Sequence, residues 1–148
     1  MTSSVWGFFY GGLINPRVLE KVGMRPKRQQ LATLGGFDLR ISPYVNLVRS
    51  PGHMVFGLLM EVTHAELQHT YSQLKAVYLP EAVLVSDVEG RFQAALCYIV
   101  PDMSPGQAEV DHVEALATAG ETLGFPQWYL TKIRSFLPSA STSPQGRS

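Results

Sequence analysis

The sequence has a single cysteine and no excess of charge of either sign. With only Cys97 present, no internal disulfide can form, and this cysteine use favours a reducing compartment, so we expect a cytoplasmic protein. Lys and Arg together number 12, as do Asp and Glu, which leaves no net positive field to attract phosphate backbones or anionic lipid. We therefore expect neither nucleic acid nor a membrane among the partners.

Long apolar runs and metal-binding patterns are also missing. No stretch reaches the roughly 18 apolar residues of a membrane-spanning helix, and residues 1–6 lack the basic and apolar segments of a secretion signal. His64 and His69 are five residues apart, which does not place them on one helical face, and no His-x-His or Glu-x-x-His pattern occurs. No Gly-x-Ser-x-Gly segment is present to expose a nucleophile. We predict no metal site, no cofactor and no hydrolase triad.

The composition favours one folded domain. The chain has 148 residues, of which 45% are hydrophobic, and a chain of this length buries most of its apolar surface in a single core. No repeat, linker or low-complexity segment interrupts residues 1–138, which we predict to be one domain. Residues 139–148 are rich in Ser, Pro and Gly, which predicts a disordered tail.

Short strands dominate the first two thirds of the chain. Strands are expected at residues 5–10, 31–41, 44–48, 54–62, 83–85 and 92–100. The Ser-Pro-Gly segment 50–52 is expected to be a turn between two of them, and a polar turn ending in Gly90 predicts an antiparallel hairpin.

Four helices are expected between and after these strands, beginning near residues 15, 63, 104 and 126. Asn15 followed by proline is a typical cap, as is the Thr63-x-x-Glu66 pair. The Ser-Pro-Gly-Gln segment 104–107 is expected to open the third helix, which ends at Gly124. The pattern predicts an α+β fold: a small, mostly antiparallel β-barrel with appended helices.

The glycine pair after the first strand could hold an anion. Gly11 and Gly12 permit close approach of the backbone, and successive N–H groups pointing into a concavity can bind a carboxylate. A plain tight turn after a buried strand is the alternative interpretation.

Five short motifs in order resemble the gamma-glutamylcyclotransferase-like (AIG2-like) family. Phe9-Tyr10-Gly11-Gly12-Leu13 is similar to the Tyr-Gly-Ser-Asn-Leu or Tyr-Gly-Thr-Leu loop near the start of those proteins. The other motifs are the Pro-Gly turn with the strand 55–59, the Glu66-Leu67 helix, the hairpin 83–100, and Leu123-Gly124-Phe125-Pro126 with Tyr129. The resemblance covers nearly the whole chain through Pro138 and implies the same barrel fold.

The resemblance also implies a chemistry. In this family the loop backbone holds the α-carboxylate end of a γ-glutamyl group, and the substrate's own amine attacks the side-chain carbonyl to release 5-oxoproline. A general base must first take a proton from the ammonium group, and the family uses a glutamate in a Leu-Asp-x-x-Glu-Gly stretch. Counting along this sequence places Leu74 at that position, and no Asp or Glu lies between Glu66 and Glu81.

The candidate site residues follow from the resemblance. Tyr10, Gly11, Gly12 and Leu13 form the substrate-binding loop, with Tyr98 and Tyr129 as further pocket residues; core packing is the alternative role for the tyrosines. Glu81 is the candidate catalytic residue that could replace the missing glutamate, and a solvated carboxylate at a strand end is its alternative.

Two functional hypotheses remain open. One is a cyclotransferase that forms 5-oxoproline with a relocated acid–base group. The other is a non-catalytic module that binds a small anionic ligand or a partner protein. We expect a small-molecule ligand at the loop, and the resemblance to some relatives also implies a homodimer.

Overall fold

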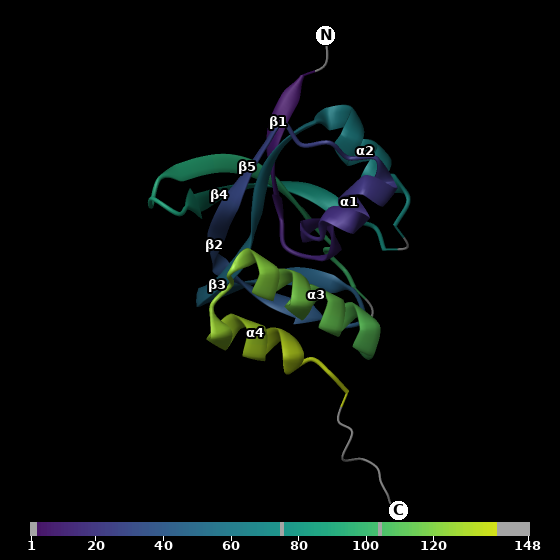
Figure 1. The fold of residues 1–148 in the computed structure, drawn as a ribbon. Coiled ribbons are helices and arrows are strands. Elements are labelled where there is room, and N and C mark those ends of the chain that lie inside the picture. The colour runs from purple at the N-terminus through teal and green to yellow at the C-terminus, as the bar shows by residue number, and fades with distance from the viewer. Residues whose placement is uncertain (1–2, 75, 104, 139–148) are drawn as a thin grey trace, which may run out of the picture.

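A closed β-barrel forms the centre of the molecule (Figure 1). The computed structural model describes residues 3–74, 76–103 and 105–138. Within them the strands are β1 (Ser4–Phe9), β2 (Arg28–Ile41), β3 (Val45–Thr63), β4 (Leu79–Asp87) and β5 (Phe92–Ile99). The order around the barrel is β1-β3-β2-β4-β5, and all neighbours are antiparallel except β1 and β5. The α+β fold with a mostly antiparallel barrel is therefore confirmed.

Helices cover two parts of the barrel. Along the chain they are η1 (Gly12–Ile14), α1 (Pro16–Val22), α2 (His64–Ser72), α3 (Val110–Leu123) and α4 (Gln127–Arg134). In Figure 1, α1 and α2 lie together on one side of β1, and α3 lies below them with α4 packed along its other side. No helix in the described ranges combines the length and apolar character that crossing a membrane requires.

The local cap signals of the sequence work as predicted. The side chain of Asn15 accepts a hydrogen bond from the N–H of Arg17 at 3.0 Å, and α1 ends at Gly23 with φ of +79°. At the start of α2, the backbone N–H of Glu66 donates to Thr63, and the N–H of Thr63 donates to the Glu66 carboxylate. These bonds fix where helices begin after the chain has left the barrel, α1 after β1 and α2 after β3.

The predicted turn at residues 50–52 is wrong, because β3 continues through it. Phe37 pairs with Arg49 and Gly35 pairs with Met54, so residues 50–53 form a bulge opposite a single residue of β2, Gly36. Proline and glycine mark bulges as well as turns, and the sequence pattern does not separate the two.

The predicted start of the third helix is also wrong. The helix begins at Val110, and Gly106 lies in a non-helical segment before it. Ser42 donates a hydrogen bond to the Gly106 carbonyl at 2.9 Å, and a Cβ at Gly106 would lie 3.0 Å from the Pro43 ring. This packing against the end of β2 replaces the predicted cap. Ser104 and the predicted tail, residues 139–148, lie outside the described residues.

The end of β1 lies close to the backbone of β3 at Gly57. Gly57 of β3 faces the end of β1, and a Cβ at this position would lie 2.2 Å from the Phe9 carbonyl oxygen. Phe8 and Leu59 pair across β1 and β3, and both are almost fully buried. Cys97 of β5 is buried in the same core, and burial raises the pKa of its thiol. The end of β1, from which the predicted loop emerges, is thus fixed by the core.

Candidate functional site

A cavity of about 370 Å³ lies beside the loop that follows β1. All four predicted loop residues line it: Tyr10, Gly11, Gly12 and Leu13. The other walls come from α1, α2 and α3 and from the segment that leads into β3. A cavity of this size, bounded by several elements, is typical of a small-molecule site.

The loop presents unused backbone donors. The N–H of Ile14 donates to the Gly11 carbonyl, and that of Asn15 donates to the Gly12 carbonyl, both at 3.1 Å. The N–H groups of Gly11, Gly12 and Leu13 make no hydrogen bond to another residue in the described part of the chain. Three consecutive free N–H groups at a wall of the cavity can receive an anionic or carbonyl oxygen.

The two glycines have different surroundings. A Cβ on Gly11 would lie 3.3 Å from the side chain of Val45, which is a tight contact. A Cβ on Gly12 would meet no atom within 4 Å. Close packing therefore explains Gly11, whereas Gly12 borders open space.

Tyr10 holds the loop to the last strand. Its hydroxyl donates a hydrogen bond to the carbonyl of Tyr98 at 2.6 Å. Burial raises the pKa of Tyr10 well above its usual value, with the nearby Cys97 as the next contribution. Tyr10 is therefore a protonated donor that positions the loop.

Further tyrosines surround the cavity. Tyr44, Tyr71 and Tyr78 line it, and the ring of Tyr71 stacks on Tyr98. The hydroxyl of Tyr78 donates to the Val45 carbonyl at 2.7 Å, and burial raises the pKa of Tyr78 to about 12. Burial also raises the pKa of Tyr71 well above its usual value. These phenols keep their protons at neutral pH.

Helix α2 brings no carboxylate to the cavity. It contributes Thr70 and Tyr71, and Leu74 follows one turn later with 43% of its surface exposed. Glu66 is turned away: its carboxylate accepts from the backbone N–H groups of Arg25 and Thr63. Burial alone would raise the pKa of Glu66, but these hydrogen bonds hold it below its usual value. None of the described residues with which α2 and the segment just after it line the cavity carries a carboxylate.

Glu81 lies at a different cavity. It sits on β4, where its carboxylate pairs with Arg49 of β3. That cavity, of about 490 Å³, is lined by Glu81 and Arg49 together with Arg40 and Asp102, and by no residue of the glycine loop. The fold thus separates Glu81 from the loop to which it was assigned as a catalytic partner.

Tyr98 and Tyr129, the other predicted pocket residues, lie at different distances from the cavity in the fold: Tyr98 next to it and Tyr129 in another cluster. Tyr98 does not line the cavity itself, but it contacts two residues that do, through its carbonyl and its ring. Tyr129 lies in a separate aromatic cluster with Phe56, Phe125 and Trp128. Its hydroxyl is buried and has no hydrogen-bond partner among the described residues. The structure thus brings Tyr98 to the loop, whereas Tyr129 lies on α4 and does not line the cavity.

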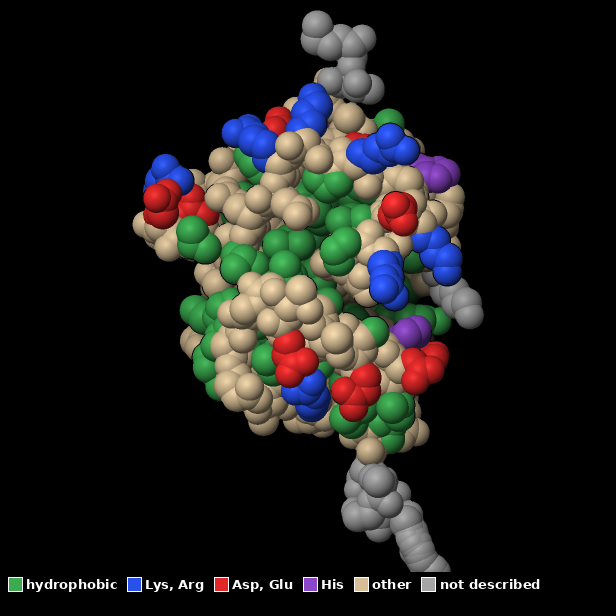
Figure 2. Space-filling view, viewed as in Figure 1, with side chains coloured by type: hydrophobic (Ala, Val, Ile, Leu, Met, Phe, Trp, Pro, Cys, Tyr) green, Lys and Arg blue, Asp and Glu red, His purple; other side chains and the backbone are tan. Residues whose placement is uncertain are grey.

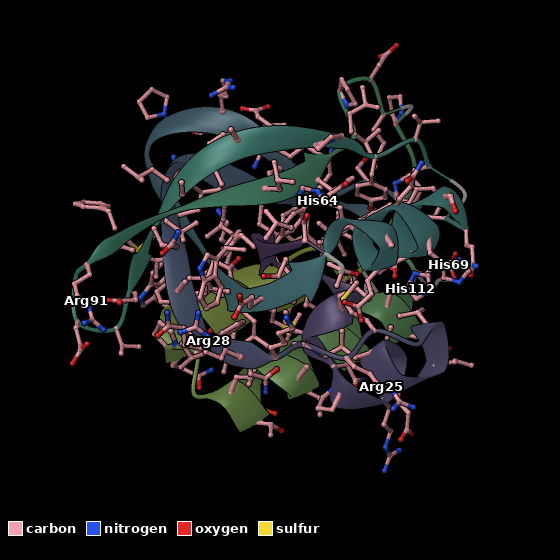
Figure 3. All side chains as sticks on the ribbon, turned by 90° about the horizontal axis from the view of Figure 1, so that it is seen from above. Arg25, Arg28, His64, His69, Arg91 and His112 are labelled. Carbon is pink, nitrogen blue, oxygen red and sulfur yellow. The ribbon has the colours of Figure 1, made fainter. Side chains whose placement is uncertain are left out.

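Helix α3 forms a wall of the cavity that was not predicted from the sequence. His112, Ala115, Leu116 and Ala119 face the cavity at helical spacing. In Figure 3, His112 lies on the side where α1 and α2 lie, whereas Arg28 and Arg91 lie on the opposite side. The spacing of these residues was visible in the sequence, but which element they would face was not.

Metal ligands do not gather in the described part of the chain. No group of three or more His, Cys, Asp or Glu side chains is arranged there to hold an ion.

Comparisons with known proteins agree on one family. The family model described as gamma-glutamyl cyclotransferase, AIG2-like, matches residues 7–118, which is more than half of the chain. No curated protein sequence matches.

Several solved structures share the fold. A gamma-glutamyl cyclotransferase has a TM-score of 0.79 and 17% identity, covering 97% of this chain and 94% of its own. An uncharacterised protein from Homo sapiens has a TM-score of 0.77 and 17% identity over the same shares. YkqA from Bacillus subtilis has a TM-score of 0.73 and 18% identity, covering 97% of this chain and 56% of its own. On the match of the family model, the chain belongs to the gamma-glutamyl cyclotransferase, AIG2-like family.

Proposed function

We propose that this protein binds a γ-glutamyl compound at the Tyr10–Leu13 loop and does not cyclise it by a carboxylate-catalysed route. The observation that carries this proposal is the combination of three free loop N–H groups with a cavity that no described Asp or Glu lines. Membership of the family supports the choice of ligand, and the named cyclotransferase of the same fold supports it further.

Binding would use the groups that face the cavity. The N–H groups of Gly11, Gly12 and Leu13 would donate to the α-carboxylate of the γ-glutamyl head. Thr70 also lines the cavity, and its hydroxyl can donate to or accept from a polar group of the same head.

Cyclisation would lack its proton acceptor. The attacking amine is an ammonium group at neutral pH and must lose a proton before it can attack. The pKa values of Tyr10, Tyr71 and Tyr78 are all raised by burial, so none of these phenols accepts a proton near neutrality. Losing a positioned acid–base group costs about 10²–10⁴ in rate.

His112 supports a second candidate function, a cyclotransferase with a different acid–base residue. It lines the cavity from α3, and its side chain is exposed. A neutral imidazole could take the proton from the substrate ammonium and return it to the departing amine. Glu81, the earlier candidate for this role, would need a rearrangement that separates it from Arg49.

Calorimetry and product release together test both functions. With γ-glutamyl ethylamide as ligand, we expect binding by the wild-type protein and no release of 5-oxoproline. Release that is lost in His112→Ala and kept in Glu81→Gln would establish the second function. Release that is lost only in Glu81→Gln would restore Glu81 as the catalyst. The absence of binding would refute the proposed function.

A further inference from the structure

The cavity wall made by the helices is apolar and faces the loop. It consists of Val18 and Val22 from α1, Leu74 after α2, and Ala115, Leu116 and Ala119 from α3. The residues of α1 are four apart, as are Ala115 and Ala119, so each pair lies on one helical face. Figure 2 shows hydrophobic side chains gathered across the middle of this face of the molecule, between α3 and the part formed by α1 and α2.

Packing within the protein leaves part of the apolar surface of this wall exposed. Val18, Val22 and Ala119 are only half-buried, and Ala115 and Leu74 are exposed. Exposed apolar groups in a concave surface gain free energy when a ligand covers them. The wall therefore has free surface for an apolar part of a ligand.

The described residues that line the cavity offer no charged partner to a second charged group of the ligand. Among the described residues that line it there is no Asp, Glu, Lys or Arg, and His112 is the one side chain that can carry charge. A charge moved from water into such surroundings without a partner is strongly disfavoured. The charged γ-glutamyl head can use the loop N–H groups and Thr70, whereas a charge at the far end of the ligand would face the apolar wall.

We propose that the cavity selects γ-glutamyl amides whose amine carries an apolar, uncharged substituent. This inference rests on the proposed function and specifies its ligand class. The γ-glutamyl head occupies the loop, and the substituent lies between α1 and α3 against Val18, Val22 and Ala119. Each methylene that becomes buried against this wall strengthens binding by about fourfold.

Ligands of matched length test the selection. The set is γ-glutamyl ethylamide, butylamide, 4-aminobutylamide and 3-carboxypropylamide, so that the last three share a similar reach and differ in terminal charge. By calorimetry we expect the butylamide to bind about fifteenfold more tightly than the ethylamide, as two further buried methylenes require. It should bind at least tenfold more tightly than either charged amide.

A charged variant tests where the substituent lies. Val18→Asp puts a carboxylate into the wall at the third residue of α1, where an acidic side chain suits the helix dipole and the fold is retained. This variant should lose affinity for the butylamide and gain affinity for the 4-aminobutylamide. The control is Val88→Asp, at a hairpin position that is 72% exposed and far from the cavity in the chain topology, and it should change neither affinity.

Results that refute the proposed function can be distinguished from results that refute only the ligand selection. If none of the four amides binds, the proposed function is refuted, and the inference with it. If all four bind with similar affinity, or a charged amide binds best, the proposed function stands and the selection is refuted. If the butylamide is preferred but Val18→Asp behaves like Val88→Asp, the wall is not the place of selection and the inference is refuted in that form.

Discussion

The ring of Tyr71 lies flat on the ring of Tyr98, with centroids 4.0 Å apart and planes 5° from parallel. This stack joins α2 to β5 next to the hydrogen bond from Tyr10 to the Tyr98 carbonyl. Tyr98→Ala should lower stability by about 0.5–1.5 kcal/mol beyond the lost burial and weaken ligand binding, because Tyr71 loses its support. Thermal unfolding and calorimetry would measure both effects. Tyr98→Phe keeps the ring and should leave both unchanged; equal losses in the two variants would contradict this role.

Introducing a carboxylate at the cavity should create activity. Leu74 lines the cavity and is 43% exposed, so Leu74→Glu can be accommodated without an unpaired buried charge. We expect release of 5-oxoproline from γ-glutamyl ethylamide to rise by about 10²-fold or more. Leu74→Gln is the uncharged control, and activity equal to that of Leu74→Glu would exclude proton transfer as the cause.

The two loop glycines should respond differently to the same substitution. Gly11→Ala forces a methyl group against Val45 and should lower the melting temperature and loosen the loop. Gly12→Ala meets no atom within 4 Å and should leave the melting temperature unchanged. Combining Gly11→Ala with Val45→Ala should recover part of the loss, as a double-mutant cycle would measure. Additive losses would show that the contact with Val45 is not the cause.

A buried carboxylate should make stability depend on acid pH. Asp38 of β2 is 5% exposed and pairs with Lys132 of α4 and with Arg40, each at 2.6 Å. Burial alone would raise the pKa of Asp38, but hydrogen bonds and charge from Lys132 and Arg40 lower it. Its contribution is therefore full above the unfolded-state pKa of about 3.9 and is lost as the pH falls through the lower folded-state pKa.

Urea unfolding at two pH values would measure this contribution. Asp38→Asn should cost about 1.5–3 kcal/mol at pH 7, as expected for hydrogen bonds to a charged group. The difference from the wild type should shrink near pH 2. Glu61→Gln removes a pair with the exposed Arg28 and should have a much smaller effect. A difference that is the same at both pH values would contradict a role of the ionised carboxylate.

Local signals in the sequence predicted the fold well where a few adjacent residues decide the structure. Asn15 with Pro16 and the Thr63–Glu66 pair fix helix starts through hydrogen bonds that span three residues or fewer. The predicted turn at residues 50–52 was wrong because the pairing of these residues with β2 decides between a turn and a bulge. Their partner is more than ten residues away along the chain, so no local pattern records it.

The site was predictable only in part, for a similar reason. The glycine loop has a contiguous motif, and its residues line the cavity. The contribution of α3, including His112, depends on how that helix packs against the loop, which no motif encodes. Glu81 was assigned to the loop from its place in the chain, but the face of a strand to which a side chain points depends on pairing register.

The parallel pairing of β1 with β5 has a consequence for the order in which the protein folds. Gly7 lies beside Leu96, so the barrel cannot close until β5 has been synthesised and pairs with β1. Contacts between such distant segments form late, because closing a long stretch of chain costs entropy before any pairing is gained. A nascent chain that stops before β5 would carry the complete glycine loop and yet have no closed barrel to hold it. The glycine loop is thus made before β5 and can take its final place in the barrel only after β5 has paired with β1.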